Sequence, residues 1–229
     1  MFFLLFSYSE ANYKMHSQYR ENGNNMEIRA YQTNLSRADL KMISDGEWLS
    51  DTVIHTVQSM IKCQFPLING LQDPVLGQES LFSIYRDVPF VQVLHTGKMH
   101  WQTISTYGCE IGEIFLFDSR VDSILTESTK KQICSILHCE NKAITVKRLP
   151  VQQQKDSNDC GLFALAFIFY IAKNLENPIS VTFNQPLLRT HLLHCLKNGK
   201  MTDFPTQSIK AKTCKEKDYV VGVSMLQKK

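Results

Sequence analysis

The longest apolar run in the chain, Leu162–Ala172, is the feature that most limits the possible folds. It is too long for an ordinary strand and contains no turn-forming residue, so it predicts a helix that is apolar on all sides. Such a helix is stable only when other elements bury it. Because about 20 residues are needed to cross a bilayer, the run predicts the centre of a globular core and no membrane anchor.

Size and composition agree with one globular domain. The 229 residues are 43% hydrophobic and 21% charged, which excludes a disordered chain, a coiled coil or a low-complexity scaffold. A net charge of only +3 leaves no basic field of the kind that binds nucleic acid. The seven cysteines form an odd set without a CxxC pair, and they predict a reducing, intracellular location in the nucleus or cytoplasm.

Apolar periodicity and turn residues divide the chain into elements. The pattern predicts a loose lead-in over residues 1–36, one domain over 37–205 and a Lys-rich tail over 206–229. Within the domain, helices are predicted at 48–62, 128–138, from 160 to at least 172 and around 186–196, and strands at 90–95, 99–106, 113–117 and 143–149. This order predicts an α+β fold with a mostly antiparallel sheet.

Cys160 stands where the polar loop of residues 151–159 meets the long apolar helix. In the first turn of a helix, free N–H groups and the helix dipole favour the thiolate, which is the nucleophilic form of cysteine. A cysteine beside an apolar run is more often a small buried hydrophobe. The rest of the sequence therefore has to decide between the two roles.

His100 and Asp118 give Cys160 a possible catalytic context. His100 lies in the predicted strand 99–106, and Asp118 directly follows the strand 113–117. If these strands are neighbours, the two side chains approach each other at one edge of the sheet, as a base and the residue that orients it. An amide of the 151–159 loop can then face a developing oxyanion. Alone, His100 indicates a structural histidine and Asp118 a strand-end cap.

Four segments of the chain resemble, in the same order, the signature blocks of the ubiquitin-like-protein-specific (SUMO- or sentrin-specific) cysteine proteases. The block at Cys160 is the most specific, and the resemblance spans residues 37–205. A later segment, Arg189 to Leu192 with Cys195, resembles the divergent, transposon-associated branch of this family. The four blocks are Trp48-Leu49-Ser50-Asp51, His100-Trp101, Phe117-Asp118-Ser119 and the residues from Gln154 to Gly161.

The resemblance implies a papain-like α+β fold with a mostly antiparallel central sheet flanked by helices. It also implies a thiol peptidase that cleaves after the C-terminal Gly-Gly of a ubiquitin-like modifier, SUMO-type or ubiquitin, without a cofactor. Family spacing selects Gln154 rather than Gln152 or Gln153 for the oxyanion hole. The remaining implied roles are Cys160 as nucleophile, His100 as general base and acid, Asp118 as the residue that orients His100, and Trp48 and Trp101 as the two rings around the Gly-Gly tail.

Other interpretations of the same residues stay open. An acyltransferase can use the same His-Asp-Cys order, and a catalytically silent domain could keep only modifier binding. Trp48 could instead anchor the first predicted helix against the sheet. His191, His194 and Cys195 stand at helical spacing, but no completing ligand pair lies at zinc spacing, so no metal site is predicted. No nucleic-acid or membrane partner is predicted either.

Overall fold

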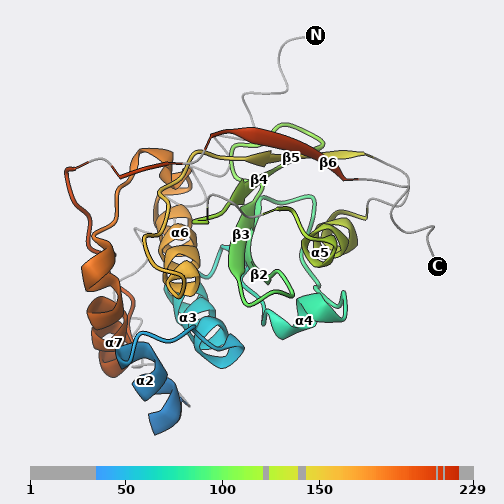
Figure 1. Ribbon diagram of the computed structural model, residues 1–229. Coiled ribbons are helices and arrows are strands. Elements are labelled where there is room, and N and C mark those ends of the chain that lie inside the picture. Colours follow the sequence, from blue (N-terminus) through green and yellow to red (C-terminus); the bar gives the residue numbers. More distant parts are fainter. Residues whose placement is uncertain (1–34, 121–123, 139–142, 210, 214, 222–229) are drawn as a thin grey trace, which may run out of the picture. The chain divides into compact units, whose positions relative to one another are not determined.

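The computed structural model of the chain describes residues 35–120, 124–138, 143–209, 211–213 and 215–221. All of them belong to the compact unit Tyr31–Lys229. They build one six-stranded sheet in the order β1-β2-β3-β4-β5-β6, with helices on both of its faces (Figure 1). The predicted lead-in falls almost entirely outside the described residues.

The elements follow one another along the chain with short connections. In order they are α2 (Arg37–Ser44), α3 (Asp51–Gln64), β1 (Asn69–Gly70), α4 (Val75–Gln78), β2 (Phe90–His95), β3 (Trp101–Ser105), β4 (Glu113–Phe117), α5 (Glu127–Leu137), β5 (Ile144–Arg148), α6 (Cys160–Asn174), the 3-10 turns η2 (Pro178–Ser180) and η3 (Gln185–Leu187), α7 (Leu188–Asn198) and β6 (Lys217–Val221).

The sheet is mixed, with more antiparallel than parallel pairs. The pairs β2–β3, β3–β4 and β5–β6 are antiparallel, whereas β1–β2 and β4–β5 are parallel. The parallel pair β4–β5 needs a crossover connection, which α5 provides. The predicted α+β fold with a mostly antiparallel sheet is thus confirmed.

Strand β3 shows how the two faces of the sheet are filled. All five of its residues are buried, and successive side chains point to opposite faces. On one face, the Thr103 hydroxyl donates a hydrogen bond to the Ala164 carbonyl of α6 at 3.3 Å. On the other face, Gln102 accepts a hydrogen bond from Thr129 of α5 at 3.0 Å. Helices α6 and α5 therefore cover opposite faces of the same central strand.

Helix α6 is the buried helix that the apolar run predicts. Twelve of its fifteen residues are buried, because α3 and the sheet both pack against it (Figure 1). The rings of Phe163 and Phe167 contact that of Phe183, with centroids 6.4 and 6.0 Å apart. None of the helices in the described ranges is long and apolar enough to cross a membrane.

Two boundaries differ from the sequence prediction. Helix α3 begins at Asp51 rather than at residue 48, because the Ser50 side chain accepts a hydrogen bond from the Val53 N–H and caps the helix there. The sheet also continues past the predicted domain end at residue 205. Strand β6 pairs with β5 through five residue pairs, although its charged and exposed residues hide the strand pattern.

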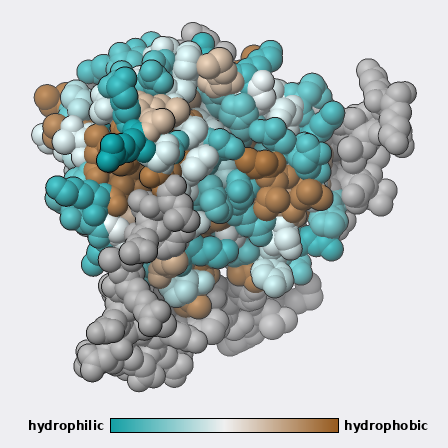
Figure 2. Space-filling view, turned by 90° about the horizontal axis from the view of Figure 1, so that it is seen from below, coloured by the Kyte–Doolittle hydropathy of each residue, from teal (hydrophilic) through white to brown (hydrophobic). Residues whose placement is uncertain are grey.

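Exposed apolar side chains occur in the stretch between α4 and β2, where Leu81, Tyr85 and Val88 are exposed. The face seen from below is mainly hydrophilic, with separate hydrophobic patches (Figure 2). Exposed apolar groups of this kind are common on globular domains.

Gly70 lets β1 approach β2 closely, and its replacement tests this packing. Its φ is +92°, and a Cβ there would lie 2.1 Å from the Val91 carbonyl oxygen. Because backbone has to move, Gly70→Ala is expected to lower the free energy of unfolding by about 3 kcal/mol, measured by urea denaturation.

Gly46→Ala is the matched control. Gly46 also has a positive φ, +80°, but a Cβ there would meet nothing within 4 Å. Only the backbone strain of about 1 kcal/mol remains. Equal losses in the two variants would contradict the close approach of β1 to β2.

Candidate active site

His100 and Asp118 meet at one end of the antiparallel pair β3–β4. His100 directly precedes β3 and Asp118 directly follows β4, so the antiparallel register places both at the same edge. The His100 Nε2 and the Asp118 Oδ1 are 2.8 Å apart. Both side chains are buried, with 4% and 0% of their surface exposed. The structure therefore brings together the histidine and carboxylate that the sequence pairs.

The turn between β2 and β3 holds His100 at this edge. The Thr96 N–H donates to the His100 carbonyl at 2.9 Å. Gly97 and Met99 both adopt positive φ, +77° and +47°, and in this conformation the chain reverses tightly. His100 is thus fixed by backbone on one side and by Asp118 on the other.

The Asp118 carboxylate has further donors besides His100. The Arg120 N–H donates to Oδ1 at 2.9 Å, and the Gln102 amide donates to Oδ2 at 2.5 Å. A buried carboxylate needs such donors because leaving water is costly for a charge. Sequence reasoning missed Gln102. Its signal was the two-residue spacing from His100, which places it on a strand face opposite the end of β4.

Cys160 is the first residue of α6 and is 1% exposed. The N–H groups of the first helical turn have no partner within the helix, so they are available beside the thiol. The next residue is glycine because the chain is close to Leu49: a Cβ at Gly161 would lie 3.0 Å from the Leu49 Cβ. This contact packs the start of α6 against the segment that leads into α3.

The protonation of His100 depends on both neighbours. Burial lowers the pKa of His100, but the hydrogen bonds to Asp118 and to Cys160 and the charges of both groups outweigh it and raise the pKa to about 9. Both neighbours therefore favour the protonated form of the imidazole. His100, Asp118 and Cys160 form one connected group.

The three glutamines of the loop before Cys160 have different partners. Gln152 is buried and pairs with the backbone of Phe183 through both amide atoms. Gln153 is buried and donates to the carbonyl of Asp118 at 3.0 Å. Gln154 is partly exposed; it accepts from the Ser119 hydroxyl at 2.7 Å and donates to the Asp156 carbonyl. Of the three, Gln154 is the one with surface left for a substrate.

The indole N–H of each tryptophan donates to a backbone carbonyl. Trp48 is 37% exposed, and its indole N–H donates to the Ser157 carbonyl at 3.1 Å. Trp101 is only 6% exposed, and its indole N–H donates to the Leu49 carbonyl at 2.9 Å. Trp48 thus contacts the loop that leads to Cys160, whereas Trp101 is mostly buried.

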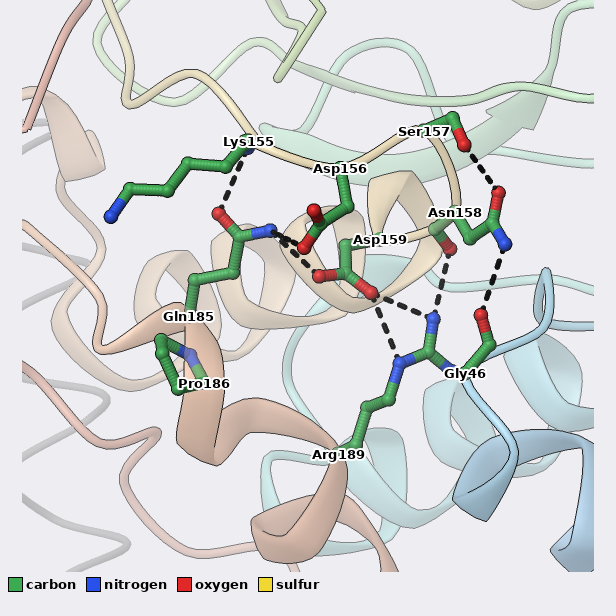
Figure 3. Close-up of a pocket in the computed structure, with 9 residues that line it drawn as sticks. All are labelled: Gly46, Lys155, Asp156, Ser157, Asn158, Asp159, Gln185, Pro186 and Arg189. Atoms are coloured by element: carbon green, nitrogen blue, oxygen red, sulfur yellow. Dashed lines mark hydrogen bonds and ion pairs between the residues drawn. The ribbon is translucent and has the colours of Figure 1, made fainter.

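A network of charged and amide groups holds the residues just before Cys160. The Arg189 guanidinium of α7 contacts the Asp159 carboxylate at 2.7 Å and also donates to the Asn158 carbonyl at 3.2 Å. The Gln185 amide donates to Asp159 and Asp156 at 2.7 and 3.2 Å. These groups line a pocket of about 490 Å³ beside the loop (Figure 3). Cys160 is therefore preceded by a firmly tethered residue, Asp159.

The His and Cys residues of α7 do not gather into a larger group. The Cys195 sulfur lies 3.4 Å from the His191 Nε2, whereas His194 pairs with Asn198. Within the described part of the chain, no three His, Cys, Asp or Glu side chains are close enough to hold a metal ion together.

Comparisons with known proteins agree with this geometry. The model of the family described as the Ulp1 protease family, C-terminal catalytic domain, matches residues 111–221, which include Asp118, Gln154 and Cys160. No match was found among curated proteins.

Several solved structures have a similar fold. The SUMO protease Ulp1 with its catalytic cysteine oxidised to a sulfinic acid matches with a TM-score of 0.56 and 14% identity, covering 81% of this chain and 94% of that chain. The Ulp1 protease domain in complex with Smt3, the yeast ortholog of SUMO, matches with a TM-score of 0.52 and 14% identity, covering 81% of this chain and 95% of that chain. A de-sumoylating protease matches with a TM-score of 0.51 and 15% identity, covering 73% of this chain and 89% of that chain. At these identities the similarity shows the fold, which is the papain-like fold that the sequence predicts.

The raised pKa of His100 predicts a pH-dependent contribution to stability. Because its pKa of about 9 in the folded protein lies above the ordinary value of 6.5, folding is favoured by the bound proton. This contribution is complete below pH 6.5 and is lost as the pH rises through 9. The difference in the free energy of unfolding between the parent and His100→Ala should therefore shrink over that range, measured by urea denaturation. A difference that is constant from pH 6 to 10 would contradict the assignment.

Proposed function

We propose that the chain, whose residues 111–221 match the model of the Ulp1 protease family, is an active thiol peptidase that cleaves after the C-terminal Gly-Gly of a ubiquitin-like modifier. The observation that carries the proposal is the buried contact between His100 and Asp118, 2.8 Å long, beside Cys160 at the start of α6. A nucleophile, a proton carrier and its orienting carboxylate are in contact.

In the proposed first step, the Cys160 sulfur attacks the carbonyl carbon of the terminal glycine. The C–S bond forms as the carbonyl π electrons move onto oxygen, and the oxyanion is stabilised by the Cys160 N–H and the Gln154 amide. The oxyanion then collapses, the C–N bond breaks, and His100 gives its proton to the leaving amine. The pKa of about 9 supports this role, because the ring still holds the proton at neutral pH.

In the second step, water hydrolyses the thioester. Neutral His100 accepts a proton from the water as its oxygen attacks the acyl carbon. The C–S bond breaks, the modifier leaves with a free carboxylate, and Cys160 returns to its starting state. Asp118 keeps the ring oriented in both steps and stabilises the imidazolium without itself taking up the proton.

The preference for Gly-Gly is proposed from the two tryptophans. Trp48 is partly exposed and contacts the loop that precedes Cys160, and the indole N–H of Trp101 donates to the carbonyl of Leu49, the residue that follows Trp48. An extended tail that passes between bulky rings and the backbone has no room for a Cβ, and glycine has none. The partner that fits is a ubiquitin-like modifier, of the SUMO type or ubiquitin, or one of its conjugates.

The acyltransferase alternative has less support. It needs a basic pocket for an anionic acyl carrier, and the pocket beside the loop contains two acidic and two basic side chains. The Arg189 charge there is already paired with Asp159. Peptidase chemistry needs no such pocket.

A panel of modifiers with a C-terminal electrophile in place of the last carboxylate tests the proposal. SUMO-type, ubiquitin and other ubiquitin-like probes are incubated with the parent, and adducts are mapped by mass spectrometry. We expect at least one Gly-Gly probe to modify Cys160, and the Ala-Ala version of that probe to react poorly. The Cys160→Ala variant should form no adduct.

Adducts at Cys109 or Cys195, or equal labelling of the parent and Cys160→Ala, would contradict the assignment of the nucleophile. Equal reaction with Gly-Gly and Ala-Ala tails would contradict the role of the tryptophans and favour a general peptidase or an acyltransferase.

A further inference from the structure

Gln102 of β3 lies directly opposite Asp118, and the two side chains are on the same face of the sheet. The register of β3 and β4 pairs Thr103 with Phe117 and Ile104 with Leu116, so the next pair in the same register is Gln102 with Asp118. Directly opposite residues of an antiparallel pair have their side chains on the same face, in contact. The Gln102 amide accordingly reaches the Asp118 Oδ2, while the Oδ1 faces His100.

The Asp118 carboxylate sets which way the Gln102 amide is turned, and Thr129 of α5 supports that orientation. Its hydroxyl lies 3.0 Å from the Gln102 Oε1 and donates to it. The amide nitrogen must then face the carboxylate, since the opposite orientation would set two acceptor oxygens against each other. Thr129 and Gln102 are both buried, at 0% and 1% exposure, so water does not compete for these hydrogen bonds.

The same turn of α5 is tied to the hairpin that carries His100. Thr126 caps α5, accepts a hydrogen bond from the Thr129 N–H, and donates its own hydroxyl to the Thr96 carbonyl at 2.9 Å. The Thr96 N–H in turn donates to the His100 carbonyl. The N-terminal end of α5 is therefore linked to Asp118 through Gln102 and to the His100 backbone through Thr96.

We propose that Gln102 and Thr129 are positioning residues, which hold the Asp118 carboxylate in the rotation that presents Oδ1 to His100. This inference rests on the proposed peptidase function for its kinetic test only. Neither side chain touches the reacting atoms. Their effect on catalysis is exerted through Asp118, whose Oδ2 accepts the hydrogen bond from the Gln102 amide.

Kinetics with the reactive Gly-Gly modifier substrate give the first test. Gln102→Met removes the amide at similar length, and Thr129→Val removes the hydroxyl at the same shape. Both should lower kcat by about tenfold to a hundredfold, by analogy with the loss caused by removing the outer partners that orient metal-binding side chains, with KM within twofold. Thr129→Ser keeps the hydroxyl and should restore kcat to within twofold of the parent.

A double-mutant cycle separates positioning from general destabilisation. In an Asp118→Ala background, Gln102→Met should cause no further loss of kcat, because the group through which it acts is gone. A further loss of tenfold in that background would overturn the proposal. So would parent-like kcat in both Gln102→Met and Thr129→Val while Cys160→Ala is inactive, a result that leaves the proposed function standing.

NMR titration of the His100 ring gives a test that needs no substrate. The titratable groups around His100 in the described residues are Asp118, Cys160 and His95, and none is altered by the variants. If Asp118 rotates away in Gln102→Met, the pKa of His100 falls toward its ordinary value. If the Asp118 carboxylate does not move, the loss of the Gln102 donor makes that carboxylate more basic. The pKa of His100 then rises, and this result would overturn the proposal. This readout decides the matter even if no modifier is cleaved.

Discussion

The buried carboxylate of Asp118 is the group on which the arrangement of this site depends. A carboxylate with no exposed surface is tolerated only where donors replace its water. These donors come from separate parts of the chain and include His100 before β3, Gln102 within β3 and the backbone of Arg120. The hydrogen bonds to the Asp118 carboxylate therefore tie together the β3–β4 register, the β2–β3 turn and, through Thr129, the start of α5.

The same end of strands β3 and β4 also positions the loop that leads to Cys160. Gln153 donates to the Asp118 carbonyl, and the Gln154 N–H donates to the Ser119 carbonyl at 2.7 Å. From there the loop runs to Asp159, where Arg189 of α7 tethers it from the other side. Helix α6 then enters the core at once. The Cys160 sulfur is held between a polar network and the buried apolar helix α6.

Much of this could be predicted from the sequence, because the relevant signals are local. The apolar run at 162–172 predicted the buried helix. The predicted strand that contains His100 and the predicted strand that ends before Asp118 indicated that the two side chains meet. Strand β6 was missed because its exposed residues are mainly charged. Gln102 was missed because its role depends on the register of two strands and on Thr129 of a distant helix. The burial of Trp101 likewise depends on the Leu49 carbonyl, a contact that no sequence pattern records.

The most direct measurement is the turnover number of Asp118→Asn with a cleavable Gly-Gly modifier substrate. The substitution keeps the size of the side chain but places an amide where the carboxylate accepts hydrogen bonds, so His100 loses its orienting partner. With a circular dichroism spectrum that matches the parent, we expect kcat to fall by roughly three to four orders of magnitude, by analogy with the serine protease triad. A loss smaller than tenfold would mean that Asp118 is only a strand-end cap, and it would contradict this account of the site.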